Sequence, residues 1–301
     1  SILQNPSYLY AQAGIYNVTL TVTDINGCIG DTTIIITVDT LPIANFNATE
    51  ECEGDSTIFT NLSTGTSGTI ITWFWEFGDL AGGTSTQENI SYLYAQAGTY
   101  NVTLTVTDDN GCIHDTTITV IVRPNPTANF SANIICEGDT TFFTDTSTIV
   151  PPLGGVITSW NWSMSDPADG NYILGTSSSS QHPIFIYHND GTYSVTLTVT
   201  DIYGCTDDTT IIVTVDPGPI ANFTATTECE GDSTVFTDAS SILPLGGVIT
   251  NWEWDFGDGT GNSILQNPSY LYAQAGIYNV TLTVTDINGC IGDTTIIITV
   301  D

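Results

Sequence analysis

The sequence has no lysine and a single arginine, Arg123, against 33 acidic residues, and its formal net charge is −32. Nucleic-acid binding is excluded, because a protein needs lysine or arginine to neutralise phosphates and release their counterions. An anionic membrane surface would repel the chain for the same reason. Its natural small partners are cations, and like charge keeps copies apart in low salt.

Long apolar runs are also missing, since no segment approaches the roughly 20 residues that a membrane helix requires. Direct insertion into a membrane is therefore not expected. There is no signal peptide either, although Ser1 is not a methionine and lies within a repeat, which indicates a mature product or a section of a longer one. The low hydrophobicity of disordered acidic chains is absent, because 41% of the residues are hydrophobic.

Catalytic motifs are absent as well. The three histidines, His114, His182 and His188, have no metal-ligand spacing. No nucleophile elbow, phosphate-binding loop or dinucleotide-binding glycine pattern occurs. The aspartates are many, but a catalytic carboxylate pair needs two opposed environments across a cleft. The sequence therefore predicts that the chain is not an enzyme and has no cofactor, with calcium as the one candidate considered below.

Internal repeats decide the domain organisation. A segment of the form GxYxVTLTVTD begins at Gly14, Gly98, Gly191 and Gly276. A second block, CEGD, begins at Cys52, Cys136 and Cys229. These repeats predict three complete modules, residues 40–122, 123–216 and 217–301, preceded by residues 1–39, which hold only the C-terminal half of a module.

Residues 1–39 return without change as residues 263–301, an offset of 262 residues that equals three modules. On its own, this late half would expose an apolar face that includes Leu20 and Val22. We therefore expect an equivalent of residues 217–262 to complete it, either earlier in the same longer chain or donated by a neighbour. The repeated ends are interpreted as the seam of a 262-residue period in a continuing polymer.

The local signals are those of β-strands throughout. In residues 16–23 apolar and polar side chains alternate, which is the period of a half-buried strand. Aromatic residues alternate in the same way on a second strand of each module, and six of them are the expected core anchors: Trp73, Trp75, Trp160, Trp162, Trp252 and Trp254. The predicted fold class is all-β, with a two-sheet sandwich in every module.

Three motifs in order carry a resemblance to a known family. They are PIANF at 219–223, WDFGDG at 254–259 and GIYNVTLTVTD at 276–286, and together they resemble the PKD (polycystic kidney disease) domain, an immunoglobulin-like β-sandwich. The resemblance covers all three modules. Module 40–122 departs at Leu80, where glycine is usual, and module 123–216 departs further, reading WSMSD at 162–166, so its turn is expected to differ.

The combination of CEGD and NGC cysteines with threonine-rich strands is similar to tandem PKD arrays in large surface and secreted proteins of Bacteroidetes-type bacteria. The resemblance implies an extracellular or cell-surface location. Short proline-containing junctions between the modules stiffen such joints, so the sequence predicts an end-to-end rod.

Seven cysteines lie in the two repeated blocks, which suggests disulfides and an oxidising compartment. Strands of six to eight residues would separate the two cysteines of one module by roughly 20–27 Å, whereas a disulfide needs Cα atoms about 4.4–6.8 Å apart. The favoured hypothesis is that disulfides join successive modules, as Cys52–Cys205 and Cys136–Cys290. Pairing within modules is the alternative: Cys52–Cys112, Cys136–Cys205 and Cys229–Cys290. Cys28 would then find its partner outside the chain.

Acidic turns raise the question of calcium, which prefers about six to eight oxygen ligands. The candidate ligands are Asp79, Asp108, Asp109, Asp207, Asp208 and Asp258. The alternative, which we favour, is that these aspartates form turns through side-chain to backbone hydrogen bonds.

A repeated Asp-Thr-Thr pattern resembles an O-glycosylation motif described for Bacteroidetes, with glycans as the implied modification. The candidate threonines are Thr32, Thr116, Thr140, Thr209 and Thr294. The alternative is a threonine that starts a strand after a turn aspartate.

Two functions remain. The first is a structural repeat of a surface fibre, filament or adhesin stalk, whose partners are copies of itself or flanking modules. The second is a polysaccharide- or protein-binding accessory module, for which Phe74 is a candidate aromatic contact. The fibre is favoured, because Asn161 and Glu253 replace Phe74 in the other modules.

Overall fold

The computed structural model describes residues 2–133, 135–229, 231–242 and 247–301. Ser1 and Glu230, which belong to the repeats, lie outside the described residues. Within these ranges every regular element is a β-strand, and no helix in them is long and apolar enough to cross a membrane. The chain divides into two compact units, residues 1–125 with 150–154 and residues 126–149 with 155–301.

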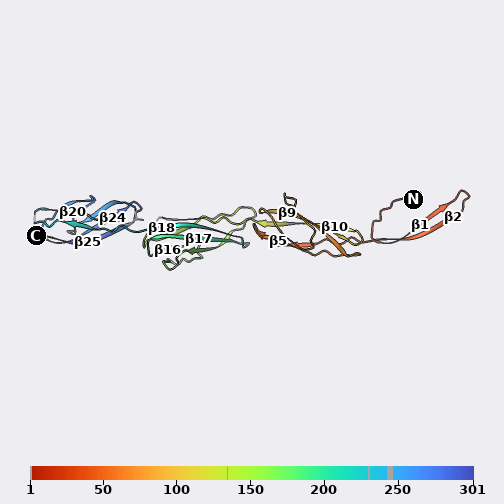
Figure 1. Ribbon diagram of the computed structural model, residues 1–301, viewed down its shortest axis with the longest axis horizontal. Helices are drawn as coiled ribbons and strands as arrows, with labels where there is room; N and C mark the ends of the chain where they lie inside the picture. The colour runs from red at the N-terminus through yellow and green to blue at the C-terminus, as the bar shows by residue number, and fades with distance from the viewer. Residues whose placement is uncertain (1, 134, 230, 243–246) are drawn as a thin grey trace. The chain divides into compact units, whose positions relative to one another are not determined.

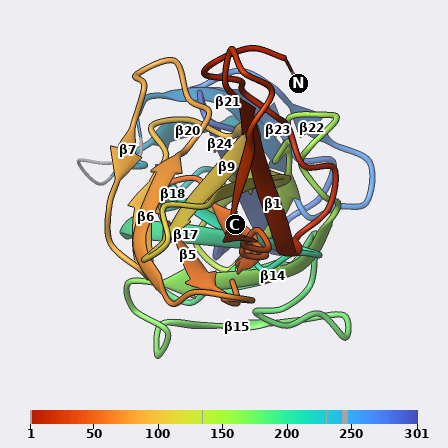
Figure 2. The same ribbon diagram turned by 90° about the vertical axis from the view of Figure 1, so that its right-hand side faces the viewer.

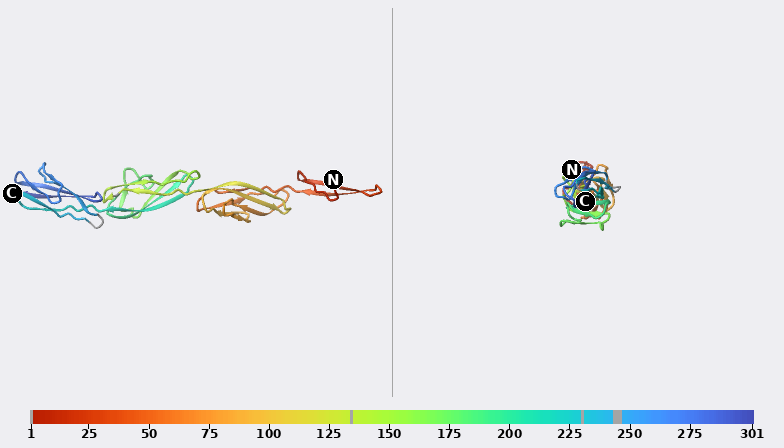
Figure 3. Two further views of the ribbon diagram at one scale, coloured as in Figure 1. Left: turned by 90° about the horizontal axis from the view of Figure 1, so that it is seen from above. Right: turned by 90° about the vertical axis from the view of Figure 1, so that its left-hand side faces the viewer.

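The first unit begins with an antiparallel hairpin of β1 (Gly14–Thr23) and β2 (Ile29–Val38), which pair along their whole length (Figure 3). Its apolar face is open, as expected. Leu20 is 57% exposed, whereas Leu282, at the same place in the identical sequence of the last module, is 0% exposed. The hairpin is therefore half of a sandwich without the sheet that covers it elsewhere.

Module 40–122 completes the first unit with two sheets. Its strands are β3 (Phe46–Ala48), β4 (Glu51–Cys52), β5 (Ser56–Asn61), β6 (Ile70–Glu76), β7 (Thr84–Ser85), β8 (Ile90–Leu93), β9 (Gly98–Asp108) and β10 (Ile113–Arg123). One sheet has the order β4-β10-β9-β6-β7 and the other β3-β5-β8. Figure 2 shows β7 beside β6, with which it pairs.

The second unit contains most of module 123–216 and the whole of module 217–301. The strands of the first are β11 (Phe130–Ala132), β12 (Ile135–Cys136), β13 (Thr140–Asp145), β14 (Ile157–Met164), β15 (Gly170–Tyr172), β16 (Ile184–Tyr187), β17 (Gly191–Asp201) and β18 (Thr206–Asp216). Those of the second are β19 (Phe223–Ala225), β20 (Ser233–Asp238), β21 (Ile249–Asp255), β22 (Asn262–Ser263), β23 (Ser269–Leu271), β24 (Gly276–Asp286) and β25 (Ile291–Val300). The long pair β24 and β25 lies side by side (Figure 1).

Each sandwich has a buried tryptophan at its centre. Trp75, Trp162 and Trp254 are at most 3% exposed, and each contacts two phenylalanine rings of the opposite sheet. Trp73, Trp160 and Trp252 are partly buried against the same three cores. The predicted alternation is confirmed in β9, where Val102, Leu104 and Val106 are fully buried. Burial stabilises the fold by about 25 cal/mol per Å² of apolar surface, so the inward faces of these strands supply much of the stability of the core.

The predicted departure of module 123–216 changes its sheet order. In the other two modules the tryptophan strand pairs with the short strand that follows it, β6 with β7 and β21 with β22. In this module the equivalent segment still contacts the tryptophan strand, because the amide of Trp162 donates to the carbonyl of Ser178 at 2.8 Å. The longer connection before it adds a further strand, β15, which joins the other sheet in the order β11-β13-β16-β15. The turn that directs the chain back in the other modules is absent here.

Candidate functional site

The second unit contains a disulfide between its two modules. Cys136, from the early block of module 123–216, bonds Cys290, from the late turn of module 217–301, with Cα atoms 5.5 Å apart and a sequence separation of 154. Cys290 is fully buried. This is one of the two pairs that the hypothesis of bonds between modules predicts, and it joins two separate hydrophobic cores covalently.

Local strand pairing explains why a cysteine of the early block reaches the next module. Cys136 lies beside Asp216, the last residue of β18, because β12 pairs with β18 in parallel. Cys52 lies beside Arg123, the last residue of β10, in the same way. Each early cysteine is thereby placed at the end from which the chain leaves its own module.

Disulfide pairing within modules, the alternative hypothesis, is wrong. Cys205 directly precedes β18 and Cys136 lies at its far end, so about 35 Å of strand separates them. Cys136–Cys205 and Cys229–Cys290 are both ruled out by the Cys136–Cys290 bond. Cys52–Cys112 fails as well, because Cys52 is disulfide-bonded while Cys112 is a free thiol. Cys205 is also disulfide-bonded, and the pairing Cys52–Cys205 stays a prediction.

The late turn that presents a cysteine is built in one way in all four copies. In the last module, Oδ1 of Asp286 accepts hydrogen bonds from the backbone amides of Asn288 at 2.9 Å and Cys290 at 2.8 Å. Asp24, Asp108 and Asp201 hold their turns with the same pair of bonds. The turn aspartate therefore fixes the backbone at the late cysteine of each copy.

Two carboxylates lie close to this junction. Burial, and then the charge of Asp286, raise the pKa of Asp216 above its ordinary value. Asp216 and Asn288 also line a groove of about 440 Å³ between the two modules of the second unit. The ionised form of Asp216 is therefore disfavoured at this junction.

Two of the calcium candidates accept strong hydrogen bonds from tyrosines. Oδ2 of Asp258 accepts from the Tyr270 hydroxyl at 2.5 Å, and this bond lowers the pKa of Asp258 to about 2. Oδ2 of Asp79 accepts from the Tyr92 hydroxyl at 2.5 Å, which raises the pKa of Tyr92 to about 12. Both carboxylates also accept backbone amides of their own turns.

The other calcium candidates lie in a late turn, at Asp108 and Asp109, and in β18, at Asp207 and Asp208. Asp109 accepts the amide of Thr69 at 2.8 Å, and Asp207 accepts the amide of Ala128 at 2.8 Å. Asp108 holds its own turn, whereas Asp208 lies opposite Thr198 in the pair of β17 and β18. In the part of the chain that the structure describes, no group of three or more acidic, histidine or cysteine side chains is arranged to hold a metal ion. Calcium binding therefore stays a prediction with turn formation as its alternative.

A comparison with known families assigns these modules. The family model of the PKD domain matches residues 39–122, 123–215 and 216–300. The chain belongs to the PKD domain family. The resemblance carried by the three sequence motifs is thereby confirmed, and so is the immunoglobulin-like sandwich that it implies.

Similar proteins include two proteases of Vibrio species. The chain is 39% identical over 116 residues to the pre-pro-metalloprotease PrtV of Vibrio cholerae, covering 38% of this chain and 12% of that protein. It is 40% identical over 70 residues to a microbial collagenase of Vibrio alginolyticus, covering 23% of this chain and 8% of the other. The solved PKD1 domain of PrtV is 37% identical, with a TM-score of 0.26, covering 28% of this chain and 98% of that domain. The chain thus spans only a small part of these relatives.

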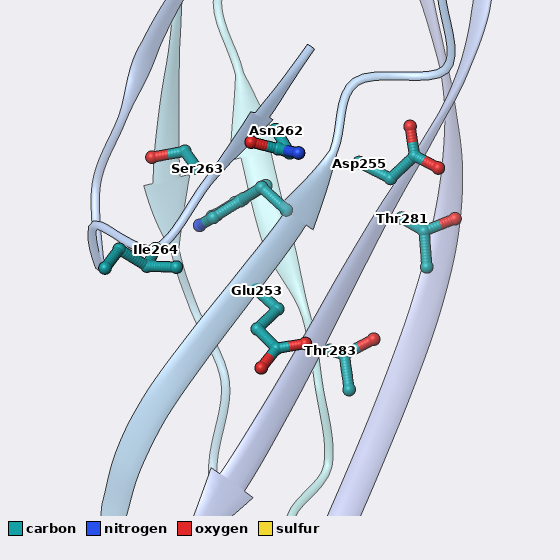
Figure 4. Close-up of a pocket in the computed structure, with 8 residues that line it drawn as sticks. Glu253, Asp255, Asn262, Ser263, Ile264, Thr281 and Thr283 are labelled. Atoms are coloured by element: carbon teal, nitrogen blue, oxygen red, sulfur yellow. The ribbon is translucent and has the colours of Figure 1, made fainter. Parts of the chain in front are cut away.

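The surface of the last PKD module has a groove of about 340 Å³ (Figure 4). Glu253 and Asp255 on β21 line it opposite Thr283 and Thr281 on β24, their cross-strand partners. The indole of Trp254 belongs to the core, since this residue is 2% exposed. The groove therefore offers oxygen atoms but no aromatic platform. Phe74, at the equivalent of Glu253 in the first PKD module, is 42% exposed.

The glycosylation candidates have two kinds of surroundings. Thr32 is exposed on the open hairpin. The other four are half-buried: Thr116, Thr140, Thr209 and Thr294. Their hydroxyls are less accessible than that of Thr32, and O-glycosylation of any of them stays a prediction, for which an intact mass far above 32.1 kDa is the test.

One feature of the PKD modules escaped the sequence analysis. Nε1 of Trp252 donates to Asp238 at 2.8 Å, and Nε1 of Trp160 donates to Asp145 at 2.8 Å. Nε1 of Trp73 is buried without a hydrogen-bond partner among the described residues. Asn61 occupies the place of these aspartates, because it pairs with Phe46 as Asp238 pairs with Phe223. An alignment of the three modules on their strands would have revealed the exchange.

Proposed function

We propose that the chain is the structural repeat unit of an extracellular surface fibre, filament or adhesin stalk with a 262-residue, three-module period. One observation carries the proposal. The same 39 residues form an open hairpin at residues 1–39 and half of a closed sandwich at residues 263–301. In the last module the second sheet covers the apolar face of this hairpin. The identical hairpin at the start of the chain requires an equivalent sheet, because a hairpin alone is at best marginally stable.

The disulfide between modules supports this role. The Cys136–Cys290 bond ties one folded module to the next, so tension passes between two cores through a covalent link in addition to the backbone. Disulfides persist in oxidising surroundings, which supports an extracellular or cell-surface location. The partners are then further copies of the same three modules.

Electron microscopy of the native material tests the proposal. Continuous filaments are expected, with the three-module period along their length. Isolated globules that show no longer assembly would contradict the fibre.

Binding of an insoluble polysaccharide is the second candidate function, and the exposed ring of Phe74 supports it. An aromatic ring of this kind can stack on a sugar. A pull-down on insoluble polysaccharides tests this function, with Phe74→Ala as the variant that loses binding. Retention of wild-type binding by Phe74→Ala would remove Phe74 from the account, and no binding by the wild type would remove the function.

A further inference from the structure

Three cysteines among the described residues are free thiols. Cys28 and Cys229 are exposed, and Cys112 is partly buried. Each occupies a repeated position that is disulfide-bonded elsewhere in the chain. Cys28 and Cys112 are late cysteines and correspond to Cys290, whereas Cys229 is an early cysteine and corresponds to Cys136. The bonded pair thus provides a rule for the free ones: an early cysteine bonds the late cysteine of the following module.

Cys229 is placed as its bonded counterpart is. The amide of Asp301 donates to the carbonyl of Glu228 at 3.2 Å, which ties the segment before Cys229 to the end of the last strand of its module. The equivalent segment at Cys136 pairs with Asp216 at the end of β18. Cys229 therefore lies at the exit of module 217–301, where a following module begins.

Cys112 is placed as Cys290 is. Oδ1 of Asp108 accepts the amide of Cys112 at 2.8 Å, the same length as the bond from Cys290 to Asp286. The amide of Gly111 donates to the carbonyl of Asp108 as that of Gly289 does to Asp286. The backbone that presents the late cysteine is thus already formed at Cys112.

The repeat order decides which late cysteine follows Cys229. The late half that precedes module 40–122 is identical to that of module 217–301, so module 40–122 is the one that follows module 217–301 in the period. Its late cysteine is Cys112. Resting on the proposed function as a repeat unit, we propose that Cys229 of one period forms a disulfide with Cys112 of the next. Cys28 is the counterpart of Cys290 in the preceding period. Its partner is therefore the counterpart of Cys136 in that period.

Formation of the bond needs a disulfide oxidant, such as oxidised glutathione or a disulfide-donating protein. One of the two thiols first exchanges with the oxidant to give a mixed disulfide, and one thiol of the oxidant leaves. The thiolate of the other cysteine then attacks the protein sulfur and displaces the second thiol of the oxidant. In total the two thiol protons and two electrons pass to the oxidant, which is reduced to two thiols.

Peptide mapping of the native protein without reduction tests this link. Trypsin is unsuitable because the chain has one arginine and no lysine, so the free thiols are alkylated and the protein is cleaved before aspartates. Cys229 is then in peptide 216–231 and Cys112 in peptide 109–114, whereas Cys28 and Cys290 are both in DINGCIG. The expected product is peptide 216–231 joined to peptide 109–114. Recovery of 216–231 in alkylated form, or joined to DINGCIG, would overturn the proposal.

A recombinant chain provides the matched control. Residues 217–262 are added ahead of residues 1–301, which completes the first half-module and places a second copy of Cys229 one module upstream of Cys112. After oxidation with glutathione disulfide, peptide 109–114 is expected in the linked form in the extended chain and in the alkylated form when the added cysteine is replaced by serine. Alkylated Cys112 in both chains would contradict the link. If filaments form without this disulfide, the proposed function is supported and this inference is wrong. If the disulfide forms without filaments, this inference is supported and the proposed function is wrong.

Discussion

At the scale of single residues, the three sandwiches differ most where a buried indole meets its acceptor. Asp238 accepts Nε1 of Trp252, whereas Asn61 presents no acceptor to Nε1 of Trp73. Asn61 instead donates Nδ2 to Oε1 of Glu88 at 3.3 Å. A buried donor without a partner costs about 1–3 kcal/mol. Module 40–122 therefore carries a defect that the last module lacks.

The double substitution Asn61→Asp with Glu88→Gln should remove this defect. It recreates the pair in which Gln266 donates to Asp238 at 3.0 Å, and it leaves the net charge unchanged. We expect the free energy of unfolding of this module to rise by about 1 kcal/mol. Asn61→Asp alone should raise the free energy of unfolding by less, because the new carboxylate faces the carboxylate of Glu88. Urea unfolding of the four chains of the cycle measures both effects, and a double variant no more stable than the wild type would contradict the account.

The aspartate–tyrosine pairs make stability depend on pH at both ends. Hydrogen bonding holds the pKa of Asp258 at about 2, below its ordinary 3.8, so its bond with Tyr270 contributes fully above pH 4 and is lost as pH falls toward 2. The pKa of Tyr92 is raised from 10.0 to about 12, so its bond with Asp79 contributes fully below pH 10 and is lost as pH rises toward 12.

Tyrosine to phenylalanine variants isolate these contributions. The stability advantage of the wild type over Tyr270→Phe should shrink between pH 4 and 2, and that over Tyr92→Phe between pH 10 and 12. Thermal melting of each pair across pH measures the differences. Advantages that stay constant over these ranges would show that the bonds do not couple to titration.

Calcium removal should leave stability unchanged. The turn carboxylates of Asp79, Asp109, Asp207 and Asp258 already accept amide or hydroxyl hydrogens. We therefore expect the same melting midpoint with a calcium chelator as with added calcium. A midpoint that rises with calcium would assign these aspartates to a binding site, because a ligand that binds only the folded state stabilises it.

At the scale of elements, a glycine at the end of the tryptophan strand permits the tight turn that brings the chain back to it. Gly78 and Gly257 have φ of +73° and +78°, and a β-carbon at either would lie within 2.3 Å of a backbone carbonyl oxygen. Ser165 occupies this place in module 123–216, where its amide donates to the carbonyl of Ser194 at 2.9 Å. A serine rarely adopts the positive φ, so the chain takes a longer path, which includes β15, before it returns to the tryptophan strand at Ser178.

Two glycines of one turn separate strain from steric clash. Gly259 has φ of +79°, like Gly257, but open space around its missing β-carbon. Gly259→Ala should cost about 1–2 kcal/mol from the backbone conformation alone. Gly257→Ala should cost roughly 2 kcal/mol more, because its β-carbon meets the carbonyl of Asn279. Equal losses in chemical unfolding would contradict this reading of the turn.

Prediction from the sequence succeeded where one residue pattern dominates. Alternation identified the strands around Leu104 and the tryptophan anchors, because burial of one face is a strong and local signal. It did not give the added strand β15, which depends on the path that replaces the glycine turn. The Cys136–Cys290 bond could be argued from strand length alone, but the parallel pairing that places Cys136 at the exit of its module is a long-range contact that no local pattern encodes.

At the scale of the whole molecule, one sequence occurs in two environments. Val22 is 58% exposed in the hairpin, and Val284, at the same place in the last module, is 0% exposed. A two-stranded hairpin is at best marginally stable by itself. The difference in stability between the two copies therefore arises entirely from residues 217–262, which cover only the second.

Amide hydrogen exchange tests this central claim most directly, because the two copies have the same intrinsic exchange rates. Peptides from residues 14–38 and 276–300 have the same masses, so copies of unequal protection give two mass envelopes for one peptide. We predict two envelopes in the 301-residue chain, and one slowly exchanging envelope when residues 217–262 are added ahead of it. A single slow envelope in the unextended chain, or two envelopes that persist in the extended one, would contradict the account.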